Sequence, residues 1–91
     1  MVAQRLTETF KQPAVVENRA GAAGGIATEM AVRAAPDGYT LLLSSAGPIV
    51  INPALYPRLG YDPQRDLAPI ALIASSPLVL VLHPSVPAKS L

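Results

Sequence analysis

The stretch Tyr39-Thr40-Leu41-Leu42-Leu43 decides the fold prediction for this chain. Its near-continuous apolar character is typical of a strand that is buried on both faces of a parallel sheet. Apolar, β-branched runs at residues 14–16, 70–74 and 78–82 predict further strands. We expect residues 41–43, 70–73 and 79–82 to form the centre of the sheet, so that Leu42→Asp would bury an unpaired carboxylate and prevent folding.

Helical spacing surrounds these predicted strands. Val2, Leu6 and Phe10 recur on one face and predict a helix that stops before Pro13. A second helix is predicted over residues 26–35, a short one over 49–56 with an interruption at Pro53, and one turn after Asp62. This alternation predicts an α/β fold, a mostly parallel, doubly wound sheet flanked by helices.

Two loops follow predicted strands, at the edge of such a sheet where ligands collect. The first is the glycine loop, residues 17–25, which leads into the second helix; the other is residues 44–48. Glycines before a helix let backbone N–H groups approach an anion closely. The same glycines are equally explained by a tight turn and close packing of the helix. The glycine spacing differs from a dinucleotide fingerprint, and the loop lacks the lysine of a phosphate-binding P-loop.

Composition excludes several classes of function. Of the 91 residues 51% are hydrophobic and 14% charged, with a net charge of +1, so the chain has neither the polarity of a disordered segment nor the basic stripe of a nucleic-acid binder. Without cysteine, disulfides and thiolate metal sites are excluded. The most apolar stretch, residues 67–82, is interrupted by Pro69 and Pro77 and is too short for a membrane span.

The sequence shows neither a catalytic motif nor a targeting signal. No nucleophile-elbow motif is present, and His83 is interpreted as the end of an apolar strand because a metal site would need further ligands. Asp62 and Asp66 are interpreted as a helix cap and its charge partner. No signal peptide is visible, since Arg5 and Glu8 lie where its apolar core would be.

Several separated motifs resemble one family. They are Val15-Val16-Glu17-Asn18-Arg19, Ala35-Pro36-Asp37-Gly38-Tyr39-Thr40-Leu41, Asn52-Pro53-Ala54-Leu55-Tyr56, Tyr61-Asp62-Pro63 with Asp66, and Pro84-Ser85-Val86-Pro87-Ala88. In this order they are similar to the tripartite tricarboxylate transporter receptors, the Bug or TctC-like extracytoplasmic solute-binding proteins. The resemblance covers essentially the whole chain.

The resemblance implies a two-lobed, type II-like periplasmic binding protein that closes on a small carboxylate-bearing solute and delivers it to integral membrane transporter subunits. It implies no enzymatic activity, cofactor, metal or nucleic-acid partner, and no membrane span of its own. Residues 1–74 would form part of the first α/β lobe, and residues 75–91 a crossover strand and the start of the connection to the second. The chain would then be an internal fragment of a longer periplasmic receptor. The implied ligand-binding residues are Ala23, Gly24, Gly25, Ser44, Ser45, Ala46 and Gly47.

The glycine loop departs from the family pattern, which usually reads Pro-Gly-Ala-Gly-Gly-Asn-Ile-Gly. Ala20 replaces the proline, Ala23 a glycine, Gly25 the asparagine and Ala27 the last glycine. Gly25 cannot supply the side-chain donor of asparagine, so contacts there must come from the backbone. Gly24→Val is expected to weaken binding with little loss of stability if the φ of Gly24 is negative.

Two alternatives remain open at this point. One is an α/β enzyme or regulatory module that binds an anionic cofactor at the glycine loop. The other is a truncated remnant without activity of its own.

Overall fold

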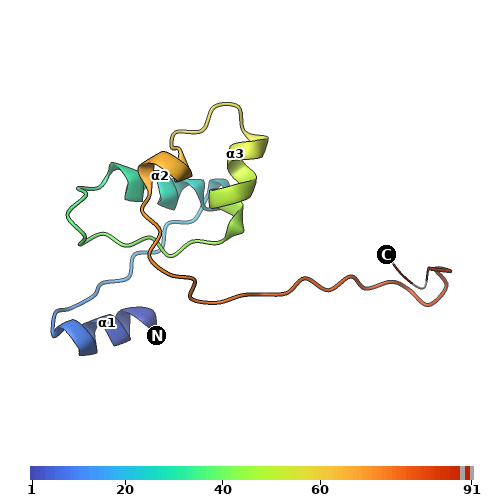
Figure 1. Ribbon diagram of the computed structural model, residues 1–91, viewed down its shortest axis with the longest axis horizontal. Helices are drawn as coiled ribbons and strands as arrows, with labels where there is room; N and C mark the ends of the chain where they lie inside the picture. The colour runs from blue at the N-terminus through green and yellow to red at the C-terminus, as the bar shows by residue number, and fades with distance from the viewer. Residues whose placement is uncertain (89, 91) are drawn as a thin grey trace.

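The computed structural model describes residues 1–88 and 90, and its described elements are all helical (Figure 1). In chain order they are α1 (Val2–Phe10), the 3₁₀ turn η1 (Ala22–Gly24), α2 (Gly25–Arg33), the π-helical turn η2 (Gly47–Ile51), α3 (Asn52–Leu55) and α4 (Pro63–Asp66).

The two longest helices agree with the sequence prediction. α1 covers the amphipathic stretch and ends where Lys11 adopts a left-handed conformation, two residues before Pro13. α2 ends at Arg33, and Ala34 is already extended. Glu29 and Arg33 form an ion pair one turn apart on its exposed face, as their spacing predicts.

The predicted short helix is one continuous helical run, η2 followed by α3. Pro53 lies inside this run, so the expected interruption at this residue is wrong. The reason is the wider hydrogen-bond spacing: the N–H of Asn52 donates to the carbonyl of Gly47, five residues earlier. At that spacing the Pro48 carbonyl would next face residue 53, and proline has no N–H to donate.

α4 is the predicted single turn. Asp62 caps its N-terminus, since its Oδ1 accepts hydrogen bonds from the N–H groups of Gln64 at 3.0 Å and Arg65 at 3.4 Å. In return, Oδ2 of Asp66 accepts from the N–H of Asp62 at 2.8 Å. Pro63 occupies the first helical position, where a missing N–H costs nothing.

The predicted sheet is absent, and the α/β fold class is wrong for this structure. Residues 14–16, 39–43, 70–74 and 78–82 are all described, and none of them forms a strand. A strand exists only through hydrogen bonds to a neighbouring strand, and each of these segments runs without one. Leu41 and Leu43 are 53% and 69% exposed and not at the centre of a sheet. The expectation that Leu42→Asp would bury an unpaired carboxylate and prevent folding therefore loses its basis.

The chain has an open shape. Its accessible surface is 8301 Å², whereas a compact monomer of 9.5 kDa exposes roughly 5,000 Å². Its radius of gyration is 17.5 Å, against about 12 Å for a compact domain of this length. Within the described residues Tyr61 is the one buried large apolar side chain. The division at residue 74 stays a prediction.

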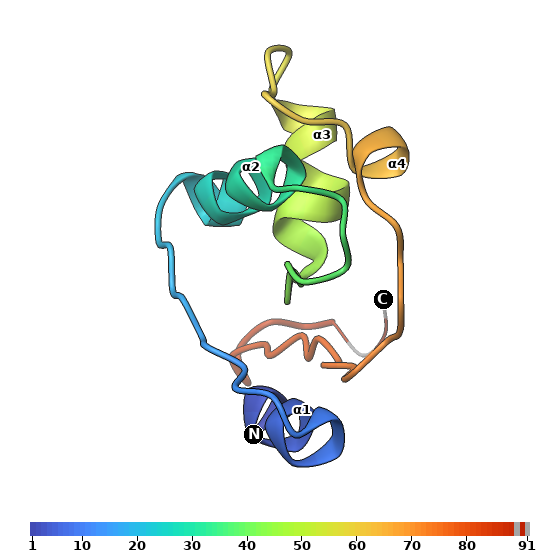
Figure 2. The same ribbon diagram turned by 90° about the vertical axis from the view of Figure 1, so that its left-hand side faces the viewer.

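Three regions make up this shape (Figures 1 and 2). A helical body contains α2, η2, α3 and α4. α1 lies apart from the body and shares a pocket with Ile73. Residues 67–83 leave the body as a single extended segment, here called the arm (Figure 1).

Candidate functional site: the paired loops

The centre of the helical body is polar. Thr28 and Asn52 are buried, and each side chain donates to a backbone carbonyl of η1: the Thr28 hydroxyl to Gly24 at 3.0 Å, and the Asn52 amide to Ala22 at 3.4 Å. The hydroxyl of buried Tyr61 donates to the Pro48 carbonyl at 2.8 Å. Each described buried side-chain nitrogen or oxygen therefore has a partner.

The glycine loop has an unusual backbone. Gly21, Ala22, Ala23 and Gly24 all have positive φ, at 125°, 47°, 50° and 85°. Alanine in the left-handed region costs roughly 1–2 kcal/mol per residue because its Cβ approaches the following carbonyl. Such strain persists only where the surroundings fix the backbone. Here the Asn52 and Thr28 side chains hold the carbonyls on either side.

The structure brings the glycine loop against the second predicted loop. A Cβ added to Gly24 would lie 2.8 Å from Cγ of Pro48, so only glycine allows this approach. A Cβ added to Gly47 would lie 3.6 Å from the carbonyl oxygen of Ala23 and 3.8 Å from Oγ of Ser45. We call residues 21–25 and 44–48, which meet here, the paired loops.

Backbone donors in the paired loops are partly occupied. The N–H of Gly24 donates to the Gly21 carbonyl at 2.9 Å, and the N–H of Gly25 donates to the Ala22 carbonyl. Gly24 and Gly25 therefore shape the loop, and their amides are engaged within it. Gly47 begins η2, and the first N–H groups of a helix have no acceptor inside that helix.

The predicted site residues differ in accessibility. Gly25 is buried and Gly24 half-buried, whereas Ala23 is exposed. Ser44, Ser45 and Ala46 are exposed and Gly47 is half-buried. Neither serine makes a hydrogen bond to the glycine loop within the described residues. Because the φ of Gly24 is +85°, the condition set for Gly24→Val does not hold, and that substitution would also reduce stability.

Sequence reasoning missed the residues that hold the paired loops together. From sequence, Asn52 is interpreted as a turn or helix start, and both Asn52 and Tyr61 are otherwise only parts of family motifs. A polar residue placed directly before a proline in an apolar helix is a usable signal, because its side chain can face a buried backbone group.

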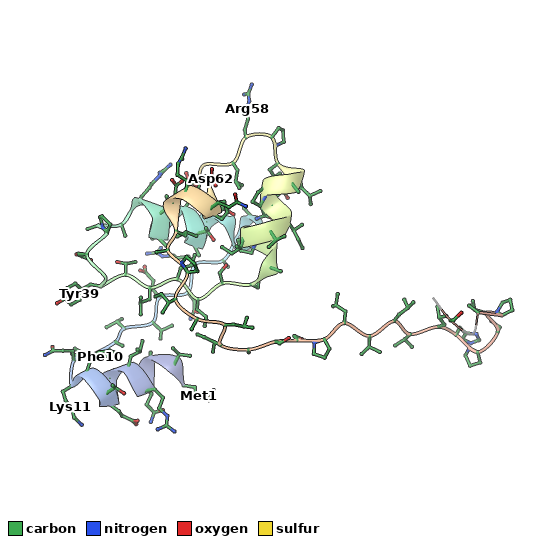
Figure 3. All side chains as sticks on the ribbon, viewed as in Figure 1. Met1, Phe10, Lys11, Tyr39, Arg58 and Asp62 are labelled. Carbon is green, nitrogen blue, oxygen red and sulfur yellow. The ribbon has the colours of Figure 1, made fainter. Side chains whose placement is uncertain are left out.

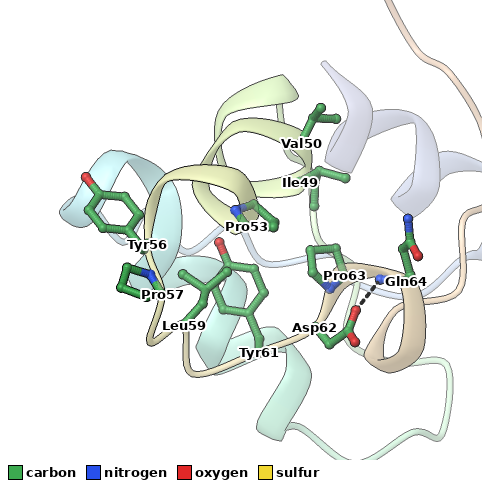
Figure 4. Close-up of a pocket in the computed structure, with 10 residues that line it drawn as sticks. All are labelled: Ile49, Val50, Pro53, Tyr56, Pro57, Leu59, Tyr61, Asp62, Pro63 and Gln64. Carbon is green, nitrogen blue, oxygen red and sulfur yellow. Dashed lines mark hydrogen bonds between the residues drawn. The ribbon is translucent and has the colours of Figure 1, made fainter.

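Two pockets are lined by residues outside the paired loops. One, of about 550 Å³, opens between α3 and the turn into α4 and is lined by Tyr56, Tyr61, Asp62 and several prolines (Figure 4). The other, of about 510 Å³, lies between the apolar face of α1 and Ile73. Neither is lined by a predicted site residue.

The ion pair between Arg65 and Asp66 at α4 shifts the pKa of both partners. Arg65 donates to Asp66 through Nε at 2.7 Å and through Nη2 at 3.2 Å. The hydrogen bond from Arg65, followed by that from the Asp62 backbone, lowers the pKa of Asp66 from its usual 3.8. The same contact raises the pKa of Arg65. Arg65 is exposed and Asp66 is half-buried at the surface, so this pair fixes a local turn and not a buried site.

No described helix has the length and apolar character needed to cross a membrane.

The candidate site is a pair of loops made of backbone and small side chains, the kind of surface that contacts a ligand through main-chain groups. Comparison with known proteins identifies the family of this chain. The family described as "Tripartite tricarboxylate transporter family receptor" matches residues 1–91, and the chain belongs to that family.

Individual relatives agree with this assignment. Protein BugT of Bordetella pertussis is 42% identical over 92 residues, which cover 100% of this chain and 28% of BugT. A UPF0065 protein from the tcbD-tcbE intergenic region of Pseudomonas sp. strain P51 is 39% identical, covering 90% of the chain and 24% of the relative. A UPF0065 protein of Agrobacterium vitis is 40% identical, covering 89% and 23%. The chain thus spans about a quarter of these relatives. No solved structure matches it.

Proposed function

We propose that this chain is part of a periplasmic solute receptor and supplies one side of a site for a small carboxylate-bearing solute. The complete receptor would deliver that solute to the integral membrane subunits of a tripartite tricarboxylate-type transporter. Family membership supports the receptor role. The observation that carries the site is the contact of the paired loops at Gly24 and Pro48.

The paired loops suit a carboxylate bound without a charged side chain. Ala23 and Ser45 are exposed beside Gly47, whose N–H starts a helical run. Amides at a helix start favour an anion by about 0.3–1 kcal/mol when exposed and up to about 2 kcal/mol when partly buried. Because the amides of Gly24 and Gly25 are engaged internally, we assign donation to Ala23, Ala46 and Gly47 and to the hydroxyls of Ser44 and Ser45.

One side of a site leaves a carboxylate largely in water, where hydrogen bonds contribute little net free energy. We therefore expect the 91-residue chain alone to show no micromolar affinity for succinate, citrate or glutamate in calorimetric titration. A chimera in which residues 1–91 replace the matching segment of protein BugT should bind at least one solute of that panel. Thermal unfolding of the chimera establishes that it is folded.

Two variants of the chimera separate binding by uncharged donors from binding by a side-chain ion pair. Ser45→Ala should weaken binding by the loss of one hydrogen bond, about 0.5–1.5 kcal/mol. Arg33→Gln should leave affinity unchanged, because Arg33 pairs with Glu29 on the exposed face of α2. Abolished binding in Arg33→Gln together with normal binding in Ser45→Ala would replace this mechanism with an ion pair.

A further inference from the structure

Asn52 is the buried side chain that reaches from α3 to the glycine loop. It is 3% exposed, and its amide donates to the carbonyl oxygen of Ala22 at 3.4 Å. The N–H of Gly25 donates to the same oxygen. This carbonyl is therefore held by two donors and faces the interior of the helical body.

The peptide bond between Ala22 and Ala23 joins this carbonyl to a donor of the proposed site. In a planar trans peptide the carbonyl oxygen and the N–H point in opposite directions, and no described peptide bond is cis. With its oxygen facing the interior, this peptide directs the N–H of Ala23 outward, where Ala23 is exposed. That N–H makes no hydrogen bond within the described residues, so it is available to a carboxylate.

The backbone of Ala23 favours the opposite orientation of this peptide. Ala23 has φ +50°, in the left-handed region where the Cβ of alanine is strained. Turning the peptide over would carry this φ into the negative range that alanine prefers, and it would direct the Ala23 N–H into the body. The hydrogen bond from Asn52 opposes this rotation, because it requires the carbonyl to face inward.

The direction of one N–H matters because no cation of the helical body takes its place. Residues 22–66 contain three basic side chains. Arg33 pairs with Glu29 and Arg65 pairs with Asp66, while Arg58 is exposed and projects away from the body (Figure 3). An anion on this part of the chain depends on uncharged donors, and their hydrogen bonds weaken steeply when misaligned.

We propose that Asn52 is a positioning residue for the solute site, which holds the Ala22 carbonyl inward and thereby aims the Ala23 N–H at the carboxylate. The inference rests on the proposed function of the paired loops. It predicts a specific coupling between two residues. Glycine at position 23 would tolerate either orientation of the peptide, so Ala23→Gly should reduce the dependence on Asn52.

The peptide orientation is measurable without a solute. In the 91-residue chain, nuclear magnetic resonance couplings that report φ should find Ala23 at positive φ, and its amide should exchange rapidly with solvent. Asn52→Leu keeps the branched shape of asparagine but cannot donate, and it should shift the φ of Ala23 to negative values while helical circular dichroism stays unchanged. Slow exchange of the Ala23 amide in the unsubstituted chain, or a positive φ retained in Asn52→Leu, would overturn the inference.

The effect on binding is measured in the BugT chimera. Asn52→Leu should weaken solute affinity about fivefold or more, because fewer molecules then present the Ala23 N–H outward. Combined with Ala23→Gly, the same substitution should cost about twofold at most. Ala27→Gly is the control for stability: it weakens α2 without touching this peptide and should leave affinity unchanged.

The outcomes separate the two proposals. Equal losses of affinity from Asn52→Leu with and without Ala23→Gly would mean that Asn52 acts only through packing, which would overturn the inference. Unchanged affinity in Asn52→Leu would overturn it as well and leave the solute site intact. A folded, unsubstituted chimera that binds no solute of the panel would instead overturn the proposed function.

Discussion

The hydroxyl of Tyr61 donates a hydrogen bond to the carbonyl of Pro48 at 2.8 Å, across thirteen residues of sequence. That carbonyl lies where the π-helical spacing of η2 would direct it toward residue 53, and Pro53 has no N–H. Tyr61 thus supplies a donor that the helix cannot. This bond holds Pro48 in place, and Pro48 is the residue against which Gly24 packs.

We predict that Tyr61→Phe destabilises the helical body by about 1–3 kcal/mol, because a buried carbonyl loses its donor. The midpoint of denaturant unfolding, followed by helical circular dichroism, measures the loss. Tyr56→Phe is the matched control: Tyr56 is half exposed, and its hydroxyl makes no hydrogen bond in the described residues. Equal effects of the two substitutions would mean that the bond to Pro48 contributes nothing specific.

Neighbouring glycines should respond differently to alanine. Gly24→Ala forces a side chain into a left-handed conformation at φ +85° and within 2.8 Å of Pro48, so we expect a loss of at least about 1–2 kcal/mol, the cost of the conformation alone. Gly25→Ala meets only ordinary contacts, the nearest at 3.5 Å, and Gly25 has helical φ and ψ. It should be neutral or slightly stabilising. Thermal unfolding of both variants compares them, and a harmless Gly24→Ala would show that the paired loops are not in close contact.

Restoring a family glycine should stabilise the loop. Ala23 stands where the family usually has glycine and adopts φ +50°, which glycine adopts without strain. We expect Ala23→Gly to raise the unfolding free energy by about 0.5–1 kcal/mol after the entropy cost of glycine. Ala27→Gly also restores a family glycine, but within α2, where it should cost about 0.5–1 kcal/mol. The same sign of change in both variants would argue against the left-handed conformation of Ala23.

The stability of the α4 turn should fall at acidic pH. Since the folded pKa of Asp66 is lowered from 3.8, its contribution to stability is complete above that value and is lost as the pH falls through the lower folded value. A carboxyl titration by nuclear magnetic resonance should show Asp66 titrating below 3.8. Arg65→Gln removes the largest cause of this lowering and should raise the pKa of Asp66 toward 3.8. A titration curve that is the same in both proteins would contradict the pairing.

Local elements were predictable from the sequence. The spacing of Val2, Leu6 and Phe10 predicted α1, and the Asp62-Pro63 pair predicted α4, because helical hydrogen bonds and caps join residues within about four positions of one another. The ends of α1 and α2 follow from the nearby Pro13 and Pro36. The effect of Pro53 was not predictable, because the donor to the Pro48 carbonyl is Tyr61, which lies outside the local sequence.

By itself, the sequence determined the positions of the helices, the small-residue character of the paired loops and the receptor family. The tertiary structure decided that the glycine loop meets Pro48 and Gly47, with Asn52 holding the Ala22 carbonyl, and that two of the predicted amide donors are engaged internally. It also decided that the apolar runs expected to form a sheet remain unpaired. The physical reason is that a helix satisfies its backbone from its own sequence, whereas a strand or a loop contact needs a partner that no local pattern specifies.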